Sequence, residues 1–185
     1  MVSSQQELQR IALAEFAIAG YTGTSIQRIA ELAGLSKSSV LYHFASKEAL
    51  LEAAAGPAVG RLDELVSRLE TNGINAEYRA AFIESFVDFI FDCRQEVHLF
   101  INQGPSLVGL AVIDRANDTV RRLVECFAAL TSNPRDKMRF GIALGGSAYM
   151  LCTADNLAMP IESDEETRRA LVEIMSELLA PVRAD

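Results

Sequence analysis

Residues 20–50 read GYTGTSIQRIAELAGLSKSSVLYHFASKEAL, and this stretch decides the fold. Its apolar residues recur at helical spacing, at Ile26, Ile29, Ala30 and Ala33. Gly34 is placed to end this helix, and Ser36 is placed to begin another over 37–44, because a serine hydroxyl can accept from the free N–H groups of a first turn. Two short helices joined by a tight turn form a helix-turn-helix pattern, although the same spacing also fits a plain helical hairpin.

The residues on either side extend this helical pattern. Apolar residues at helical spacing predict a helix over 5–19, which Gly20 ends. Thr24 or Ser25 begins the next helix, since both hydroxyls fit the cap position. Ser46 begins a further helix after the turn that follows the third one.

In this order the stretch resembles the DNA-binding signature of TetR-family regulators. The shared features are a glycine followed by an aromatic residue, a Thr-Ser pair, the run IAELAGLS, a tyrosine-containing third helix that ends in Phe44, and the segment SKEAL. The match runs without a gap over about the first quarter of the chain. It departs from the family pattern in two places: Leu41 stands where a tyrosine is usual, and a basic N-terminal arm is missing.

The resemblance implies an all-α protein with a helix-turn-helix DNA-binding domain at 1–50 and a helical ligand-sensing and dimerisation domain at 51–185. It implies a homodimer that binds double-stranded DNA at an inverted-repeat operator. It also implies a repressor that a small apolar or amphipathic effector releases from that operator. The alternative is a helical binding protein of the same fold that acts through a protein partner.

The third helix is expected to enter the major groove with its N-terminal end toward the bases. Lys37 would donate to guanine acceptors, and Ser38 and Ser39 are short enough to let the helix approach. Backbone phosphate contacts are expected from Thr24 or Ser25, from Lys47 and, by the resemblance, from Tyr42 and His43.

Beyond residue 50 the apolar spacing predicts helices throughout. They are expected over 50–70, 77–94, 97–103, 106–130, 135–156 and 164–179. Gly56-Pro57 is expected to kink or break the first of them, because proline lacks an N–H and its ring clashes with the carbonyl four residues earlier.

Aromatic residues follow one side of the 77–94 helix and, with residues of other helices, are expected to wall an apolar pocket for the effector. The residues assigned to this pocket are Phe82, Phe86, Phe89, Cys93, His98, Asn102, Phe127, Tyr149 and Cys152. The alternative is that the aromatic stripe is ordinary core and that His98 is a surface residue.

A dimer face is expected on the last two helices. It is assigned to Gly145, Gly146, Leu171, Ile174 and Leu178. The paired glycines would let another helix come close, and the apolar stripe would pack in a four-helix bundle with the twofold mate. The alternative is that the same stripe packs within one chain.

Composition excludes several classes of protein. The net charge is −8, but residues 1–50 carry four basic and four acidic residues, so the excess of acid lies beyond residue 50. The three scattered cysteines indicate reduced thiols, and neither a disulfide framework nor a metal site is expected. No phosphate-binding loop, G-x-S-x-G motif or metal-spaced cluster occurs, so we expect neither catalytic residues nor a cofactor. A signal peptide is missing and the longest uncharged run, 140–154, is too short to span a membrane, which predicts a cytoplasmic protein.

Overall fold

The computed structural model describes residues 4–73, 76–153 and 163–182, which contain helices and no strand. The α-helices are α1 (Ser4–Ala19), α2 (Ile26–Leu32), α3 (Lys37–His43), α4 (Lys47–Asn72), α5 (Ala76–Asp92), α6 (Arg94–Gln103), α7 (Ala111–Leu130), α8 (Pro134–Gly141), α9 (Ser147–Thr153) and α10 (Asp164–Leu179). A 3-10 turn, Gly104–Ser106, precedes α7, and a π-helical turn, Ile142–Gly146, connects α8 to α9. The prediction of an all-α fold is confirmed.

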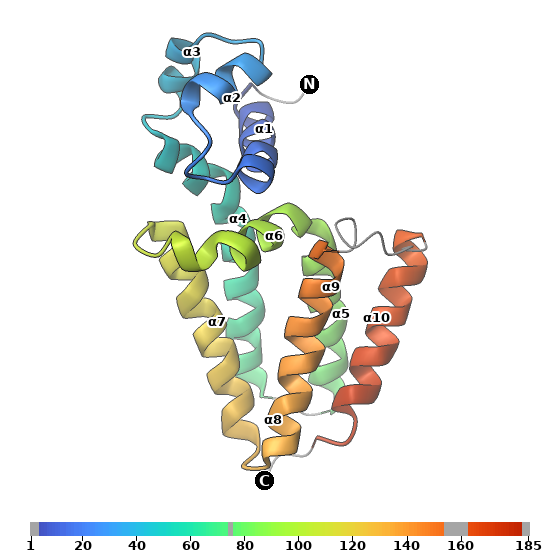
Figure 1. The fold of residues 1–185 in the computed structure, drawn as a ribbon. Coiled ribbons are helices and arrows are strands. Elements are labelled where there is room, and N and C mark those ends of the chain that lie inside the picture. The colour runs from blue at the N-terminus through green and yellow to red at the C-terminus, as the bar shows by residue number, and fades with distance from the viewer. Residues whose placement is uncertain (1–3, 74–75, 154–162, 183–185) are drawn as a thin grey trace.

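α4 joins a small head to a helical bundle. Figure 1 shows α1, α2 and α3 gathered around the first turns of α4, which then continues downward between the bundle helices. α6 lies across the end of the bundle that faces the head, and α5, α7, α8, α9 and α10 form its body. The division expected at residue 50 therefore falls inside α4, which belongs to both parts.

Hydroxyl side chains begin the helices of the head as the sequence predicts. The Ser25, Ser36 and Ser46 hydroxyls accept from backbone N–H groups in the first turns of α2, α3 and α4, at 3.1, 3.1 and 3.0 Å. Of the two candidates for the start of α2, Ser25 is therefore the cap. Gly34 has a φ of +65°, a left-handed conformation that glycine adopts without strain, and it turns the chain from α2 into α3.

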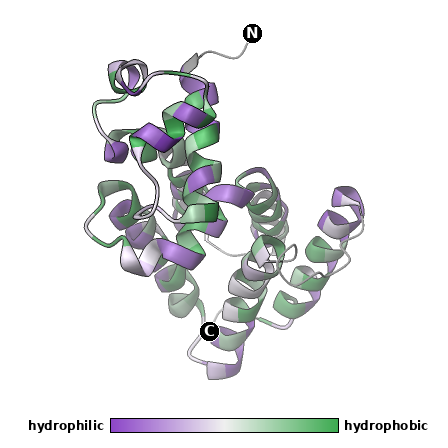
Figure 2. Ribbon diagram, turned by 45° about the horizontal axis from the view of Figure 1, so that its top comes forward, coloured by the Kyte–Doolittle hydropathy of each residue, from purple (hydrophilic) through white to green (hydrophobic). Residues whose placement is uncertain are grey.

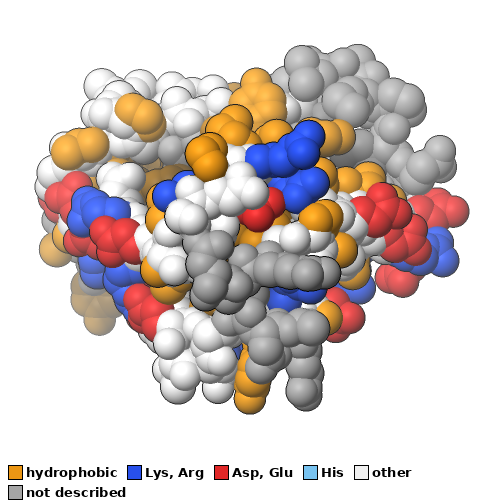
Figure 3. All heavy atoms as spheres, turned by 90° about the horizontal axis from the view of Figure 1, so that it is seen from below, with side chains coloured by type: hydrophobic (Ala, Val, Ile, Leu, Met, Phe, Trp, Pro, Cys, Tyr) orange, Lys and Arg blue, Asp and Glu red, His pale blue; other side chains and the backbone are white. Residues whose placement is uncertain are grey.

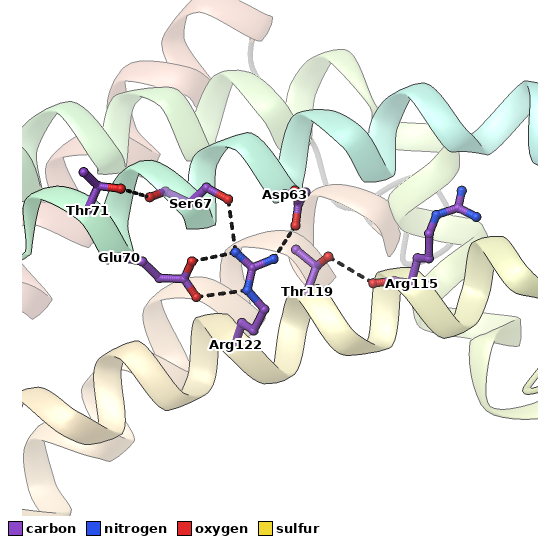
Figure 4. A network of polar contacts seen from close by, with 7 residues as sticks. All are labelled: Asp63, Ser67, Glu70, Thr71, Arg115, Thr119 and Arg122. Atoms are coloured by element: carbon purple, nitrogen blue, oxygen red, sulfur yellow. Dashed lines mark hydrogen bonds and ion pairs between the residues drawn. The ribbon is translucent and has the colours of Figure 1, made fainter.

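The expected break at Gly56-Pro57 is not present, because α4 is one helix through this point. Two arginines of α7 brace it from the side. Arg115 pairs with Glu52, before the proline, at 2.5 Å. Arg122 contacts three α4 side chains after the proline, as Figure 4 shows: Asp63, Ser67 and Glu70. α7 therefore contacts α4 both before and after the position where proline supplies no backbone N–H.

The later helices differ from the expected ranges at their ends. α6 begins at Arg94 instead of residue 97, and the segment expected as one helix over 106–130 begins as a helix only at Ala111. The helix expected over 135–156 is a run of α8, the π-helical turn and α9, and its last three residues lie outside the described part of the chain. The predicted range 164–179 agrees with α10.

Two hydrophobic clusters hold the fold together. One fills the bundle and includes Phe82, Ile83, Val87, Ile90 and Met175. The other extends from the head into the bundle. It contains Leu8, Phe16, Ile29 and Val40 of the head together with Leu99 of α6 and Val112 and Ile113 of α7. Hydrophobic and hydrophilic residues share the same helices in Figure 2, as expected of amphipathic helices that bury one side. The head and the bundle are thus packed on one another through a common core.

The end of the bundle opposite the head is chemically mixed. Figure 3 shows acidic, basic and hydrophobic side chains interspersed over this face, without a large area of one kind. Among the described helices, none is both long enough and apolar enough to cross a membrane.

Candidate functional site

α3 presents a polar and aromatic face to solvent. Lys37 and Ser38 are exposed, and the Tyr42 side chain is 87% exposed, whereas Val40 on the opposite side is fully buried. The Tyr42 ring meets the His43 ring edge-on, with 5.4 Å between their centroids. The buried Val40 fixes the rotation of the helix, so that Lys37 and Tyr42 point outward from a rigid base.

Three serine hydroxyls meet at the start of α3. The Ser36 oxygen lies 2.9 Å from that of Ser38 and 2.7 Å from that of Ser39. The Ser36 hydroxyl therefore caps α3 and also hydrogen-bonds to Ser38 and Ser39, the two serines expected near DNA. Because each hydroxyl has one donor and two acceptor positions, the trio can still accept or donate toward solvent.

The structure separates the roles of Thr24 and Ser25. Thr24 is buried, and its hydroxyl donates to the Gly20 carbonyl oxygen at 2.8 Å, so it faces the interior of the head. Ser25 is exposed beside it at the start of α2. Ser25 therefore lies on the surface where a phosphate contact was expected, whereas Thr24 does not.

Lys47 ties α4 to the loop before α2. Its Nζ donates to the carbonyl oxygens of Tyr21 and Thr24, at 2.8 and 2.9 Å, and lies 4.2 Å from the centre of the Tyr21 ring. Two of the three ammonium protons are used in this way, and one remains for another acceptor. The lysine is thus a structural link as well as a candidate phosphate contact.

Two of the four basic residues of the head are paired with acidic residues within it. Arg10 binds Glu7 at 2.5 Å, and Arg28 binds Glu15 at 3.2 Å. In the described part of the head, Lys37 is the cation for which the structure gives neither an ion pair nor a hydrogen bond. Lys37 on α3 is therefore the most available positive charge on this surface.

A cavity of about 330 Å³ lies in the bundle beneath the head. It is lined by Ala55, Ala58, Val59, Leu62, Phe86, Phe89, Ile90, Glu96, Val97, Phe100, Ile101, Val112, Ile113, Ala116, Val120, Leu123, Leu144, Gly145, Ala148 and Tyr149. Of the residues assigned to a pocket from sequence, this lining includes Phe86, Phe89 and Tyr149. The sequence also points to Phe100 of α6 as a pocket wall, and the lining includes it. The contributors from α4 and α7 are not predicted from sequence, because an apolar helix face looks the same whether it meets a neighbour or a cavity.

The other residues assigned to the pocket lie elsewhere. Phe82 stacks on Phe86 and Phe127 stacks on Phe140 in the bundle core. Cys93 is buried in the same hydrophobic cluster, where Arg61 contacts its sulfur. His98 Nδ1 donates to the Cys152 carbonyl oxygen at 3.0 Å, so that this contact joins α6 to α9. The side chain of Asn102 turns back to donate to the His98 carbonyl oxygen at 2.9 Å.

Burial also accounts for the state of two cysteine thiols. It raises the pKa of Cys93 and of Cys152 to about 11. Near neutral pH both are therefore protonated thiols, which are weak nucleophiles and poor metal ligands.

The residues assigned to a dimer face divide into two groups. Gly145 is exposed and Ile174 is 52% exposed, whereas Gly146 and Leu178 are half-buried and Leu171 is buried in the bundle core. Further apolar side chains are exposed on α8, α9 and the turn between them, at Met138, Ile142, Tyr149 and Met150.

Gln103, the last residue of α6, joins the bundle to the head. Its Nε2 donates to the Phe16 carbonyl oxygen at 2.7 Å, and its Oε1 accepts from the Tyr21 backbone N–H at 2.8 Å. The Phe16 carbonyl lies in the last turn of α1, where helix carbonyls have no partner in their own helix. Four residues of α6 also line the cavity: Glu96, Val97, Phe100 and Ile101. One short helix therefore touches both the cavity and the head.

Comparison with known proteins places the head in a family. Residues 10–54 match the model described as "Bacterial regulatory proteins, tetR family". The chain is 38% identical over 66 residues to the HTH-type transcriptional repressor AcnR of Corynebacterium efficiens, which covers 36% of this chain and 35% of that protein. It is 56% identical over 39 residues to the HTH-type transcriptional regulator RutR of Escherichia coli K12, covering 21% of this chain and 18% of that one. The matches thus span about a third or less of these curated relatives.

The whole fold also resembles a solved structure. The ketosteroid transcriptional regulator KstR2 of Mycobacterium tuberculosis superposes with a TM-score of 0.69 at 15% identity, over 100% of this chain and 97% of that one. At this identity the likeness shows a common fold, in the bundle as well as in the head.

Proposed function

The chain belongs to the tetR family of bacterial regulatory proteins, and from this premise we propose that it is a DNA-binding repressor that a small molecule releases from an inverted-repeat operator. The observation that carries the proposal is the face of α3, where Lys37 and Tyr42 are exposed over the buried Val40. A rigid helix with a free cation and an exposed phenol is suited to the major groove and its phosphate walls.

Individual contacts follow from this geometry. Lys37, at the N-terminal end of α3, would donate to a base edge, with Ser38 and Ser39 close to the groove floor. Phosphate contacts are assigned to Ser25, Tyr42 and His43, and to the remaining proton of Lys47. Residues 1–50 act as the reader of DNA and residues 51–185 as the sensor, with α4 shared between them.

A homodimer is part of the proposal, because an inverted repeat requires two recognition helices related by a twofold axis. The exposed apolar side chains of α8, α9 and α10 provide a face for it, together with the exposed Gly145. Ile174 and Leu178 of α10 would pack at its edge, whereas Leu171 supports it from within.

Selection of bound fragments from random DNA tests the proposal. We expect the dimeric protein to enrich an inverted repeat whose half-site centres lie about 10 base pairs, or a multiple of that, apart. A dimer that retains no palindrome through repeated rounds would refute operator binding and favour the alternative, action through a protein partner.

Two lysines should have distinguishable roles on DNA. Lys37→Ala is expected to relax preference at one base position at a cost of about 1–3 kcal/mol. Lys47→Ala is expected to weaken binding to all sequences alike and, if its free proton meets a phosphate, to reduce the slope of log affinity against log salt by about one. Competition binding at several salt concentrations measures both effects.

Because Lys47 also bonds within the head, the slope of log affinity against log salt is the quantity that distinguishes a phosphate contact from a structural role. Loss of the bonds to Tyr21 and Thr24 would weaken DNA binding by loosening the head, but it would leave the salt slope unchanged. Lys47→Ala with an unaltered slope would therefore assign the residue a structural role alone.

We further propose that the cavity and the DNA-binding head are coupled by two helices. α4 runs from the Lys47 link into the cavity wall at Ala55 and Ala58, and α6 runs from the cavity wall to Gln103. A ligand that moves either helix changes the position of the head and hence the separation of the two recognition helices. Such a ligand acts only to the extent that it binds the two arrangements with different affinity.

A further inference from the structure

The lining of the cavity is almost entirely apolar and contains one acidic side chain. Apart from Glu96 and Tyr149, every lining residue has a hydrocarbon side chain or is a glycine. No lysine, arginine or histidine is among the described lining residues, so nothing there can neutralise a negatively charged ligand. Moving a carboxylate from water into such surroundings costs free energy unless a partner is provided.

Glu96 adds a second reason against an anion. It lies in the first turn of α6, half-buried, and no side chain within ion-pair distance neutralises it in the described structure. Arg61, the cation that acts on it from farther away, is held by Asp92 at 2.9 Å and by the Cys93 sulfur at 3.5 Å. Burial raises the pKa of Glu96, and a second carboxylate in the same cavity would be repelled by the first.

Resting on the regulator function proposed above, we infer that the effector is an uncharged apolar molecule, and that Glu96 makes the cavity discriminate against carboxylates of the same size and shape. The apolar lining supplies affinity through burial of hydrocarbon, which does not depend on a charged head group. Glu96 supplies the selectivity between a neutral ligand and an acid.

The test uses two probes with the same ten-carbon chain, 1-decanol and decanoate, near pH 8, where the acid is ionised. Binding is measured by displacement of an apolar fluorescent dye and by calorimetry on the full chain. We expect decanoate to bind at least about tenfold more weakly than decanol, a difference of about 1.4 kcal/mol. Equal affinities for the two probes would overturn the inference.

Glu96→Gln removes the charge while keeping the size of the side chain. It should strengthen decanoate binding several-fold and leave decanol binding within about twofold. Glu125→Gln is the matched control, because Glu125 is an exposed acid of α7 outside the cavity lining, and it should change neither affinity. An acid bound with its carboxylate in solvent near the half-exposed Tyr149 would not respond to Glu96→Gln, and that outcome would also overturn the inference.

A third variant locates the binding. Ala116→Leu adds volume in the cavity wall and should weaken both probes, since Ala116 lines the cavity from α7. Operator binding without probes is measured on the same protein. If the protein binds an operator but not decanol, the inference about the ligand fails while the regulator function stands. If the protein discriminates between the two probes but selects no operator, the regulator function fails while the selectivity of the cavity stands.

Discussion

Gln103→Leu is expected to abolish the effect of ligand on DNA binding while leaving ligand binding itself within about twofold. In coupled systems a ligand typically changes the second affinity by about 5- to 150-fold, and we expect the variant to reduce that factor to less than about twofold. The physical reason is that the Gln103 side chain hydrogen-bonds to both the Phe16 carbonyl and the Tyr21 N–H, so a movement of the end of α6 also moves the head. Leucine has similar size but cannot make either bond.

The measurement compares operator affinity with and without saturating decanol, alongside decanol affinity by calorimetry. Asn102→Ala is the control, because Asn102 lies on the same helix but bonds only within α6. Gln103→Leu also leaves two polar backbone groups unpaired, at about 1–3 kcal/mol each, so unfolding by urea is measured in parallel. A folded Gln103→Leu protein that keeps full coupling would show that the signal travels through α4 alone.

Phe127→Ala is expected to lower the free energy of unfolding by about 3–5 kcal/mol without changing decanol affinity. The Phe127 ring is buried, with its centroid 4.1 Å from that of Phe140 and 5.8 Å from that of Phe82. Removal of the Phe127 ring would leave a void. The neighbouring rings cannot fill it by small shifts, because they already pack closely.

Urea unfolding followed by circular dichroism checks the stability, and dye displacement checks the cavity. Val124→Ala serves as the control on the same helix, since that side chain is 60% exposed and its loss should cost less than about 0.5 kcal/mol. If folded Phe127→Ala protein bound decanol more than about tenfold more weakly than the unaltered protein, Phe127 would belong to the lining of the cavity, as the sequence predicts.

The head could be predicted in detail because its decisive contacts are local. Ser25, Ser36 and Ser46 each bond to an N–H three residues later, and Gly34 needs its left-handed φ whatever surrounds it. Such contacts are encoded within a few residues and can be recognised from spacing alone.

The site could be predicted only in part, because it depends on contacts between distant residues. Phe82 and Phe86 are four residues apart on one face of α5, but only Phe86 reaches the cavity while Phe82 meets Phe127. The contact between Gln103 and Tyr21 spans 82 residues, and no pattern in the sequence marks it. The arginines of α7 that contact α4 before and after Pro57 likewise cannot be found from the sequence of α4 alone.

The hydrophobic cluster that extends from the head into the bundle has a consequence for building chimeric regulators. Exchange of heads between related proteins at residue 50 would cut α4 and divide a core that contains Phe16 and Ile29 of the head as well as Leu99 and Val112 of the bundle. A transplanted head would pack against side chains of a different protein in this cluster, and the close packing between head and bundle would be lost. A workable graft must carry residues through the end of α4 at Asn72 and adapt the donor's counterparts of α6 and the start of α7 as well.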